Sequence, residues 1–464
     1  MSKRRMSQRL IGYGAARSVV DGVTSVRGIA LASIVGAEAF GTWLLFRIIL
    51  RYASFAGLGM QRGLEFGVAG EGNALAWGKA AVSLVLVIFV PLSTLFLLGS
   101  ILWQDGPVAT SLAAVGAIIL VNRLWILATN YLRGTGALRR LAGLEIVVGL
   151  LQAVLVILLA LVFGVLGAFA GMFLGFLAGA LLFFRAYPLS PRWDAHRAAA
   201  MIRVGFPVTL SGLLLASFGF SDRLVVGVLL GVEALGLYGF AIAAAEMGQN
   251  LANVTRTVVL PDIYGKVDTE AAGGGDSGNL QRVLVGFALI VPVMCGYFAL
   301  LIEPVVRALA PDYIEAMPIT RTYLFVAATH GLSILATLGV VARGRQTALP
   351  FLSLAGIVLN VTVSYTLIKI GGGLAAIAFA ALVAHGLHAI ALMVLASGKT
   401  RRLRSALTAS ATLLPVLWCL GAVLLLAEFR PAAPLWQAAG LFTLAVLPLL
   451  AVPLRGMRNG GRAA

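Results

Sequence analysis

The chain has 464 residues, of which 60% are hydrophobic and 11% are charged, and its mean hydropathy is +0.98. This composition excludes an ordinary soluble domain and predicts an all-α, polytopic membrane protein. The formal net charge of +17 raises the question of nucleic-acid binding, which the distribution of the charge decides.

Apolar runs bounded by charge or by Gly and Pro predict about fourteen transmembrane helices, with boundaries good to about four residues. The basic start Met1-Ser-Lys-Arg-Arg leads into a run that carries charge, so no cleavable signal peptide is expected. The predicted spans are 11–34, 39–61, 78–103, 108–132, 142–163, 165–185, 204–230, 235–258, 282–302, 317–341, 347–368, 374–396, 407–427 and 434–454.

Lys and Arg alternate in abundance from one predicted loop to the next. The loops on the side of the N-terminus are rich in them, whereas the opposite loops hold only Arg307, Lys369 and Arg430. This is the positive-inside pattern of a membrane protein, and it predicts that both termini lie in the cytoplasm. The basic excess therefore indicates topology, and nucleic-acid binding is not expected.

The two cysteines and four histidines show no metal-binding pattern. Cys295 and Cys419 fall in separate spans and are expected to be buried, unpaired thiols. His385 and His388 share one face of a helix and are interpreted as packing or pore residues. No metal site is expected.

The sequence contains an internal repeat. Gly36-Ala-Glu-Ala-Phe-Gly-Thr-Trp43 follows the first span, and Gly231-Val-Glu-Ala-Leu-Gly-Leu-Tyr238 follows the seventh. A second echo places Arg133-Gly134 after the fourth span and Arg343-Gly344 after the tenth. Six spans separate each pair, so the two copies share one orientation in the membrane.

This duplication predicts two pseudo-symmetric six-helix lobes around a central cavity, with substrate bound between them near the midplane. The predicted lobes are 1–186 and 200–396, and an additional transmembrane helix pair is expected at 407–455.

The pattern resembles a known family. The first loop, the Arg-Gly turns, Asp222-Arg223, the Gly236-Leu-Tyr238 turn and Leu260-Pro261 together resemble the polysaccharide transporter family, the Wzx-type O-antigen and exopolysaccharide flippases. This family belongs to the multidrug/oligosaccharidyl-lipid/polysaccharide exporter superfamily. The resemblance covers the first twelve spans, and one departure is Ala37, where relatives often carry Pro.

The resemblance implies a flippase in a bacterial inner membrane that works by alternating access. Its implied substrate is an oligosaccharide linked to polyprenyl diphosphate, which moves from the cytoplasmic to the outer leaflet. The implied partners are this lipid-linked glycan, membrane lipids and polysaccharide-assembly proteins, and a monomer is expected.

Arginines inside the first spans are the candidate substrate-binding residues. Arg47 and Arg51 lie one helical turn apart on the second span, and Arg27 reaches a similar depth on the first. Guanidinium groups stay charged when partly desolvated and match the oxygens of a diphosphate. The alternative is structural pairing within the lobe.

Further candidates are less specific. Arg17 and Asp21 could form an ion pair within the first span or a gate that substrate phosphate opens, and Arg123 beside Asn122 could supply donors.

In the second lobe, Arg223 is a further candidate for substrate binding, and Asp222 and Glu246 are candidates for a coupling proton or sodium ion. Interhelical hydrogen bonds are the alternative for both carboxylates. Gly205, Pro207, Gly212 and Gly219 indicate either a hinge at the start of the seventh span or close helix packing.

Other functions remain open. A lipid II-type flippase also needs a cationic cavity, whereas a multidrug exporter of cations would need acidic residues in place of these arginines. A membrane glycan polymerase or transferase is disfavoured because the outer loops are short, and no nucleotide-binding glycine loop is present. We therefore expect no enzyme and no cofactor beyond H⁺ or Na⁺ coupling.

Overall fold

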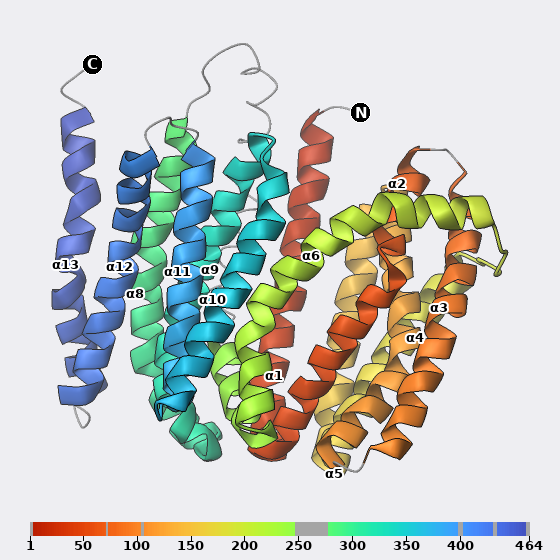
Figure 1. The fold of residues 1–464 in the computed structure, drawn as a ribbon, viewed down its shortest axis with the longest axis horizontal. Coiled ribbons are helices and arrows are strands. Elements are labelled where there is room, and N and C mark those ends of the chain that lie inside the picture. The colour runs from red at the N-terminus through yellow and green to blue at the C-terminus, as the bar shows by residue number, and fades with distance from the viewer. Residues whose placement is uncertain are drawn as a thin grey trace. The chain divides into compact units, whose positions relative to one another are not determined.

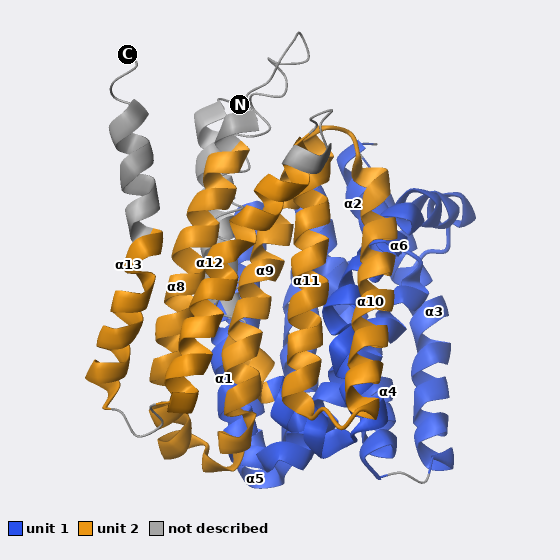
Figure 2. Ribbon diagram, turned by 60° about the vertical axis from the view of Figure 1, so that its left-hand side comes forward, with its two compact units in different colours: residues 1–239 blue, residues 240–464 orange. Residues whose placement is uncertain are grey.

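The computed structural model describes residues 3–70, 73–103, 106–245, 277–397, 402–429 and 434–460, and these ranges are almost entirely helical. The backbone contacts divide the chain into two compact units, Met1–Gly239 and Phe240–Ala464 (Figure 2). The predicted all-α fold is thus confirmed. The predicted lobe boundaries 1–186, 200–396 and 407–455 stay predictions.

Unit 1 is a bundle in which helices that are neighbours in sequence and helices that are distant in sequence both pack together (Figure 1). Helices α3 and α4 form one hairpin, and α5 packs against both α1 and α4. The elements are α1 (Lys3–Ala53), the 3-10 helix η1 (Ser54–Gly57), α2 (Met60–Gly70), α3 (Ala74–Leu102), α4 (Gly106–Gly134), α5 (Leu138–Ala186) and α6 (Ala195–Leu229).

Two of these helices are bent by glycine. The backbone of α1 leaves helical geometry at Gly36, with φ of 78°, and that of α5 does so at Gly164, with φ of 58°. Left-handed values of φ are readily adopted only by residues without a Cβ atom, so a single glycine can reverse the chain. Both sites coincide with predicted loops, and each bent helix therefore holds two predicted spans.

Ten described helices are long and apolar enough to cross a membrane. Two shorter apolar helices, Val232–Ala245 and Leu435–Leu449, overlap the predicted eighth and fourteenth spans. The count of fourteen crossings stays a prediction.

The repeated loop forms a reciprocal contact within unit 1. Gly36 and Gly231, the first residues of the two copies, both have left-handed φ, 78° and 90°. A Cβ atom on Gly41 would lie 1.8 Å from the carbonyl oxygen of Val232, and one on Gly236 would lie 1.8 Å from that of Ala37. Each copy therefore places its second glycine against the second residue of the other copy.

The second repeated motif is a pair of similar turns after α4 and α9, but the predicted alignment of the two turns is wrong by two residues. The turn after α4 has its left-handed glycine at Gly136, whereas the turn after α9 has it at Gly344. In each turn the glycine amide donates to the carbonyl oxygen three residues before it. The amide of the next residue donates to the carbonyl oxygen five residues before itself. Gly134 still belongs to α4, so the structure pairs Gly136, rather than Gly134, with Gly344.

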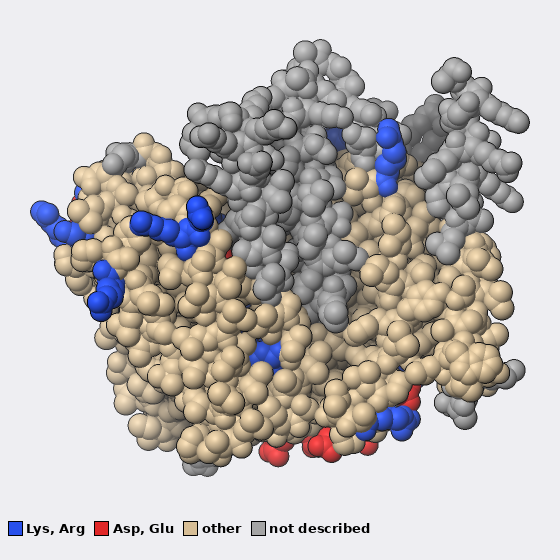
Figure 3. Space-filling model, turned by 180° about the vertical axis from the view of Figure 1, so that it is seen from behind, with Lys and Arg blue, Asp and Glu red and all other residues tan. Residues whose placement is uncertain are grey.

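Basic residues gather at one end of unit 1. Arg133 at the end of α4 lies 3.8 Å from Glu65 on α2, and the guanidinium of Arg197 on α6 lies 6.0 Å from the ring centroid of Trp77 on α3. Figure 3 shows Lys and Arg mostly near the upper end of the visible face of unit 1, beside a broad area without charge. This separation of charge is the one that the positive-inside pattern predicts.

Helix α6 first crosses the end of unit 1 and then turns along the other helices (Figure 1). Its first part packs tightly on α2, because a Cβ atom on Gly63 would lie 2.0 Å from the Met201 carbonyl oxygen. A Cβ atom on Gly205 would lie 1.9 Å from the oxygen of Gly59, whereas Gly212 has open space around it. Gly205 therefore serves close packing, and Pro207 interrupts the hydrogen bonds of α6 where a bend is predicted.

Unit 2 is a bundle with α9 near its centre. Helix α9 packs against α8, α11 and α12, and α11 also contacts α10. The elements are α8 (Ser277–Leu309), the 3-10 helix η2 (Pro311–Ala316), α9 (Met317–Ala342), the 3-10 helix η3 (Gln346–Ala348), α10 (Leu349–Lys369), α11 (Leu374–Ser397), α12 (Arg402–Phe429) and α13 (Leu435–Gly460).

Candidate functional site

Four arginines from three helices form a cationic cluster in unit 1. Arg47 and Arg51 come from the second arm of α1, Arg123 from α4 and Arg223 from α6. Arg51 lies within electrostatic range of Arg47 and Arg223, and Arg123 lies within the same range of Arg51. Four of the predicted substrate-binding residues are thus brought together. Like charges at this range repel, so such a cluster favours an anionic ligand.

An aromatic ring lies between two of these cations. The guanidinium of Arg51 lies 5.3 Å from the centroid of Phe220, and that of Arg223 lies 4.4 Å from the same centroid. Cations above a ring face are attracted by its quadrupole. The hydroxyl of Tyr52 also donates to that of Ser217 at 3.2 Å, so α1 and α6 are joined beside the cluster.

The members of the cluster differ in exposure. Arg47 and Arg51 are exposed, whereas Arg123 is buried. The guanidinium of Arg123 donates to the side-chain oxygen of Asn122 and lies 5.9 Å from the ring centroid of Phe89. The cluster thus combines two exposed guanidinium groups with one that is buried.

Arg27 has a structural contact that the sequence interpretation missed. Its guanidinium donates to Gln152 on α5 at 2.9 Å, and the amide nitrogen of Gln152 donates to the carbonyl of Met172 at 3.3 Å. Both side chains are buried. The sequence did contain a signal for this contact, because Gln152 lies in a long apolar run of α5 and a buried polar group requires a partner.

Three predicted residues lie beyond the described contacts. Arg17 and Asp21 belong to α1, but their side chains lie outside the described part of the chain, and Glu246 lies outside the described residues altogether. Their predicted roles in gating and ion coupling stay predictions.

Asp222 and Arg223 have different partners, as their adjacent positions on a helix predict. Asp222 is almost completely buried and accepts a hydrogen bond of 2.9 Å from the hydroxyl of Tyr238. Arg223 instead lies over Phe220. Tyr238 is the last residue of the second repeated loop, so the repeat itself supplies the partner of this carboxylate.

Unit 2 contains histidines and thiols in place of buried arginine. His330 on α9 lies edge-on to His385 on α11, with ring centroids 5.1 Å apart. Cys295 and Cys419 are buried free thiols, as predicted. Among the described residues, no group of His, Cys, Asp or Glu is arranged to hold a metal ion.

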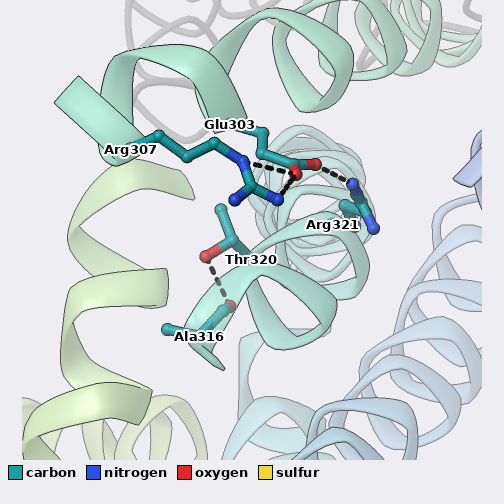
Figure 4. A network of polar contacts seen from close by, with 5 residues as sticks. All are labelled: Glu303, Arg307, Ala316, Thr320 and Arg321. Carbon is teal, nitrogen blue, oxygen red and sulfur yellow. Dashed lines mark hydrogen bonds and ion pairs between the residues drawn. The ribbon is translucent and has the colours of Figure 1, made fainter. Parts of the chain in front are cut away.

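A separate polar network lies at one end of unit 2 (Figure 4). Glu303 on α8 pairs with Arg307 at 2.7 Å and, through its other oxygen, with Arg321 on α9. Arg321 also borders a shallow hollow against the end of α12, where Glu428 lies. The network joins α8 to α9, and its arginines are already matched by a carboxylate.

Comparisons with known proteins identify both a family and a fold. The model of the family described as "Polysaccharide biosynthesis protein" matches residues 75–312, slightly more than half of the chain. No curated protein matches the chain.

Several solved structures share the architecture. The chain is similar to the lipid II flippase MurJ in an inward closed conformation, with a TM-score of 0.74, 14% identity and coverage of 96% of this chain and 99% of that one. It is also similar to the inward-facing conformation of a multidrug resistance MATE family transporter of the MOP superfamily, with a TM-score of 0.64, 17% identity and coverage of 85% and 95%. The outward-facing conformation of such a transporter matches with a TM-score of 0.56, 16% identity and coverage of 88% and 96%. At these identities the likeness shows the fold.

Proposed function

This chain belongs to the polysaccharide biosynthesis protein family, and on that premise we propose that it is a flippase for lipid-linked oligosaccharide. Its substrate is a glycan carried on polyprenyl diphosphate, and its reaction is transfer from the cytoplasmic to the outer leaflet of a bacterial inner membrane. No covalent chemistry is needed, so the protein is a transporter rather than an enzyme.

The cationic cluster carries this proposal. A diphosphate cannot enter hydrocarbon with its charge exposed, because burying an unpaired ion costs many kcal/mol. Arg47 and Arg51 offer two exposed guanidinium groups one helical turn apart, and Arg223 adds a third beside Phe220. Guanidinium groups bind phosphate oxygens through two parallel hydrogen bonds, which fixes orientation as well as charge.

The same cluster separates the proposal from its alternatives. An exporter of organic cations would meet repulsion at Arg47, Arg51 and Arg223, although transporters of that kind share the fold. A lipid II flippase also has this fold and its substrate also carries a diphosphate, so lipid II is the competing substrate to test.

Alternating access accounts for the movement. MATE transporters of the same fold have been seen facing inward and outward. In this chain, Pro207 weakens the backbone of α6 between the part that packs on α2 and the part that carries Arg223. We assign bending of α6 to the step that moves Arg223 relative to the rest of unit 1.

The test is flipping of fluorescent polyprenyl-diphosphate oligosaccharide by full-length protein in liposomes. Arg47→Ala/Arg51→Ala should reduce the flipping rate by at least about tenfold, because losing a partner of a desolvated charge costs roughly 2–5 kcal/mol and each 1.4 kcal/mol is tenfold. Arg51→Lys should restore only part of the rate, since an ammonium lacks the planar fork.

Matched controls are Arg62→Ala and Arg139→Ala, which remove arginines at the basic end of unit 1 and should leave the rate unchanged. Equal rates in wild type and the double variant would assign Arg47 and Arg51 to structure alone. Absence of flipping of any diphosphate-linked lipid by wild type would overturn the flippase assignment, and a preference for lipid II would replace the substrate.

A further inference from the structure

Three of the four histidines of the chain lie together in unit 2. The ring centroids of His330 on α9 and His385 on α11 lie 5.1 Å apart at an interplanar angle of 86°, and His388 lies one turn further along α11. His385 and His388 are only 3% and 6% exposed. All three are near the middle of helices that are long and apolar enough to cross a membrane.

The helices around this histidine cluster provide polar groups rather than charges. Helix α10 packs against α11, and its buried residues are Ser353, Gly356, Asn360 and Ser364. The hydroxyl of Ser364 donates to the side-chain oxygen of Asn360 at 3.4 Å. A polar stripe therefore runs along the buried face of a helix whose other residues are mostly apolar.

In the described part of unit 2, no carboxylate lies at the level of the histidine cluster along the helices. On the elements packed against α9 and α11, the carboxylates all lie toward the end marked by η2. Apart from the histidines, the charged or titratable groups whose side chains are described on these elements, α9 included, are Arg282, Cys295, Tyr297, Glu303, Arg307, Asp312, Tyr313, Glu315, Arg321, Tyr323, Tyr365, Lys369, Cys419 and Glu428.

Three of these charged groups are matched with each other, because Glu303 pairs with both Arg307 and Arg321. Among the described residues, no group of His, Cys, Asp or Glu is arranged to hold a metal ion. An imidazole can bind a proton without any further ligand.

Imidazole has the chemistry for a proton that binds and leaves. With an ordinary pKa of about 6.5, it is the side chain that changes charge between pH 5 and 8. One ring nitrogen of a neutral imidazole accepts a hydrogen bond while the other donates, so neighbouring rings can share one added proton. Ionisable groups within membrane spans are costly and usually mark an ion pathway.

We propose that His330, His385 and His388 form the binding site for a coupling proton. A proton from the water on the outer side adds to one imidazole nitrogen, is shared within the cluster, and leaves to the cytoplasm after the conformational change. At the end of the cycle the imidazoles are neutral again, so each proton that binds is also released. The coupling of this cycle to outward movement of the lipid-linked anion rests on the proposed function; the binding of the proton does not.

The first experiment measures proton binding without any substrate. Full-length protein with ¹³C- and ¹⁵N-labelled histidine is placed in lipid nanodiscs and titrated between pH 4 and 9 by NMR. His196 is exposed on α6, outside the cluster, and its ring signals serve as the reference. The rings of the cluster should titrate together, so that His330→Gln changes the titration of both His385 and His388. Rings that stay unchanged across this range, or that titrate independently, would overturn the site.

The second experiment measures coupling in liposomes with the membrane potential clamped by K⁺ and valinomycin. A gradient of one pH unit supplies about 1.4 kcal/mol for each proton, so the steady-state ratio of flipped lipid between leaflets should shift about tenfold in wild type. His385→Gln/His388→Gln should leave the ratio independent of the gradient, and the control His196→Gln should behave as wild type.

The outcomes separate the two proposals. Coupled titration with no flipping would keep the proton site and overturn the flippase. Flipping that ignores the proton gradient, or that follows a Na⁺ gradient, would keep the flippase and overturn proton coupling. His388→Gln alone serves as a second variant if the double variant does not fold, and it should weaken the response to the gradient.

Discussion

The two units bury different kinds of polar side chain. Unit 1 buries arginine, with Arg27 and Arg123 7% and 6% exposed, and unit 2 buries histidine beside hydroxyl and amide groups. No described Lys or Arg of unit 2 is buried to the same extent. A guanidinium keeps its charge at any working pH, whereas an imidazole gains and loses it. The duplicated scaffold thus holds a permanent positive charge in one unit and a titratable group in the other.

The two copies of the repeated loop share their backbone geometry more closely than their side-chain chemistry. The two repeated loops share the left-handed glycine and the close-packed glycine, but they end in Trp43 and Tyr238. Trp43 packs against Phe46 and Phe169, with ring centroids 5.6 Å away in each case. Tyr238 adds a hydroxyl, which binds Asp222. One changed side chain gave the second copy a buried carboxylate partner.

The largest effect is expected from substitutions that disrupt the glycine contact between the two copies of the repeated loop. Gly41→Val and Gly236→Val should each abolish folding, because even a Cβ atom would lie 1.8 Å from a carbonyl oxygen of the other copy. The measurement is the yield of monodisperse protein in size-exclusion chromatography. The control is Gly212→Val, which meets nothing within 4 Å. A variant at Gly41 that folds while the one at Gly236 does not would show that the contact is not reciprocal.

A smaller effect on stability is expected from a substitution that tests whether Arg27 of unit 1 is a structural or a ligand-binding residue. Gln152→Leu removes the acceptor of Arg27 and should lower the free energy of unfolding by about 1–3 kcal/mol, the cost of leaving a buried polar group without its hydrogen bond. Thermal unfolding in detergent measures the loss. If stability is unchanged but flipping stops, Arg27 binds substrate as the sequence first predicted.

The smallest effect is expected at the Asp194 carboxyl, whose contribution to stability depends on pH. The backbone amide of Arg197 donates to Asp194 at the start of α6 and lowers the pKa of this carboxyl below its ordinary value of 3.8, with help from the Arg197 guanidinium. A depressed pKa stabilises the fold above the unfolded-state pKa, and the stabilisation is lost as pH falls through the folded-state value. Asp194→Ala should therefore lower the unfolding temperature slightly and equally between about pH 5 and 8.

The difference between Asp194→Ala and wild type should vanish only in strong acid. Unfolding temperatures across the pH range check this expectation. A difference that persists undiminished in strong acid would contradict the assignment of the effect to the Asp194 carboxylate.

Much of the fold could be predicted from the sequence because the dominant signals are local. Apolar runs, the alternation of basic loops and the glycines at 36 and 164 act over one helix or one turn, so their effects are readable without tertiary contacts. The register of the second echo was misjudged for the same reason. Arg133-Gly134 looks like a turn, but the left-handed position is Gly136, which only the hydrogen bonds of the turn reveal.

The site was less predictable because its contacts cross helices. The candidates Arg47, Arg51, Arg123 and Arg223 could be selected by charge and depth, but the ring of Phe220 between two of them could not, since it looks like any lipid-facing aromatic residue. The association of His330 with His385 likewise depends on how α9 and α11 are rotated. Helix rotation follows from packing, which a single sequence does not contain.

The reciprocal glycine contact also bears on ancestry. Gly41 against Val232 and Gly236 against Ala37 form a self-complementary pair, the geometry by which two identical subunits associate about a twofold axis. A half-length chain carrying this loop once would meet a second copy of itself through the same atoms. Fusion of two such chains would leave the interface intact while freeing each half to change its other side chains.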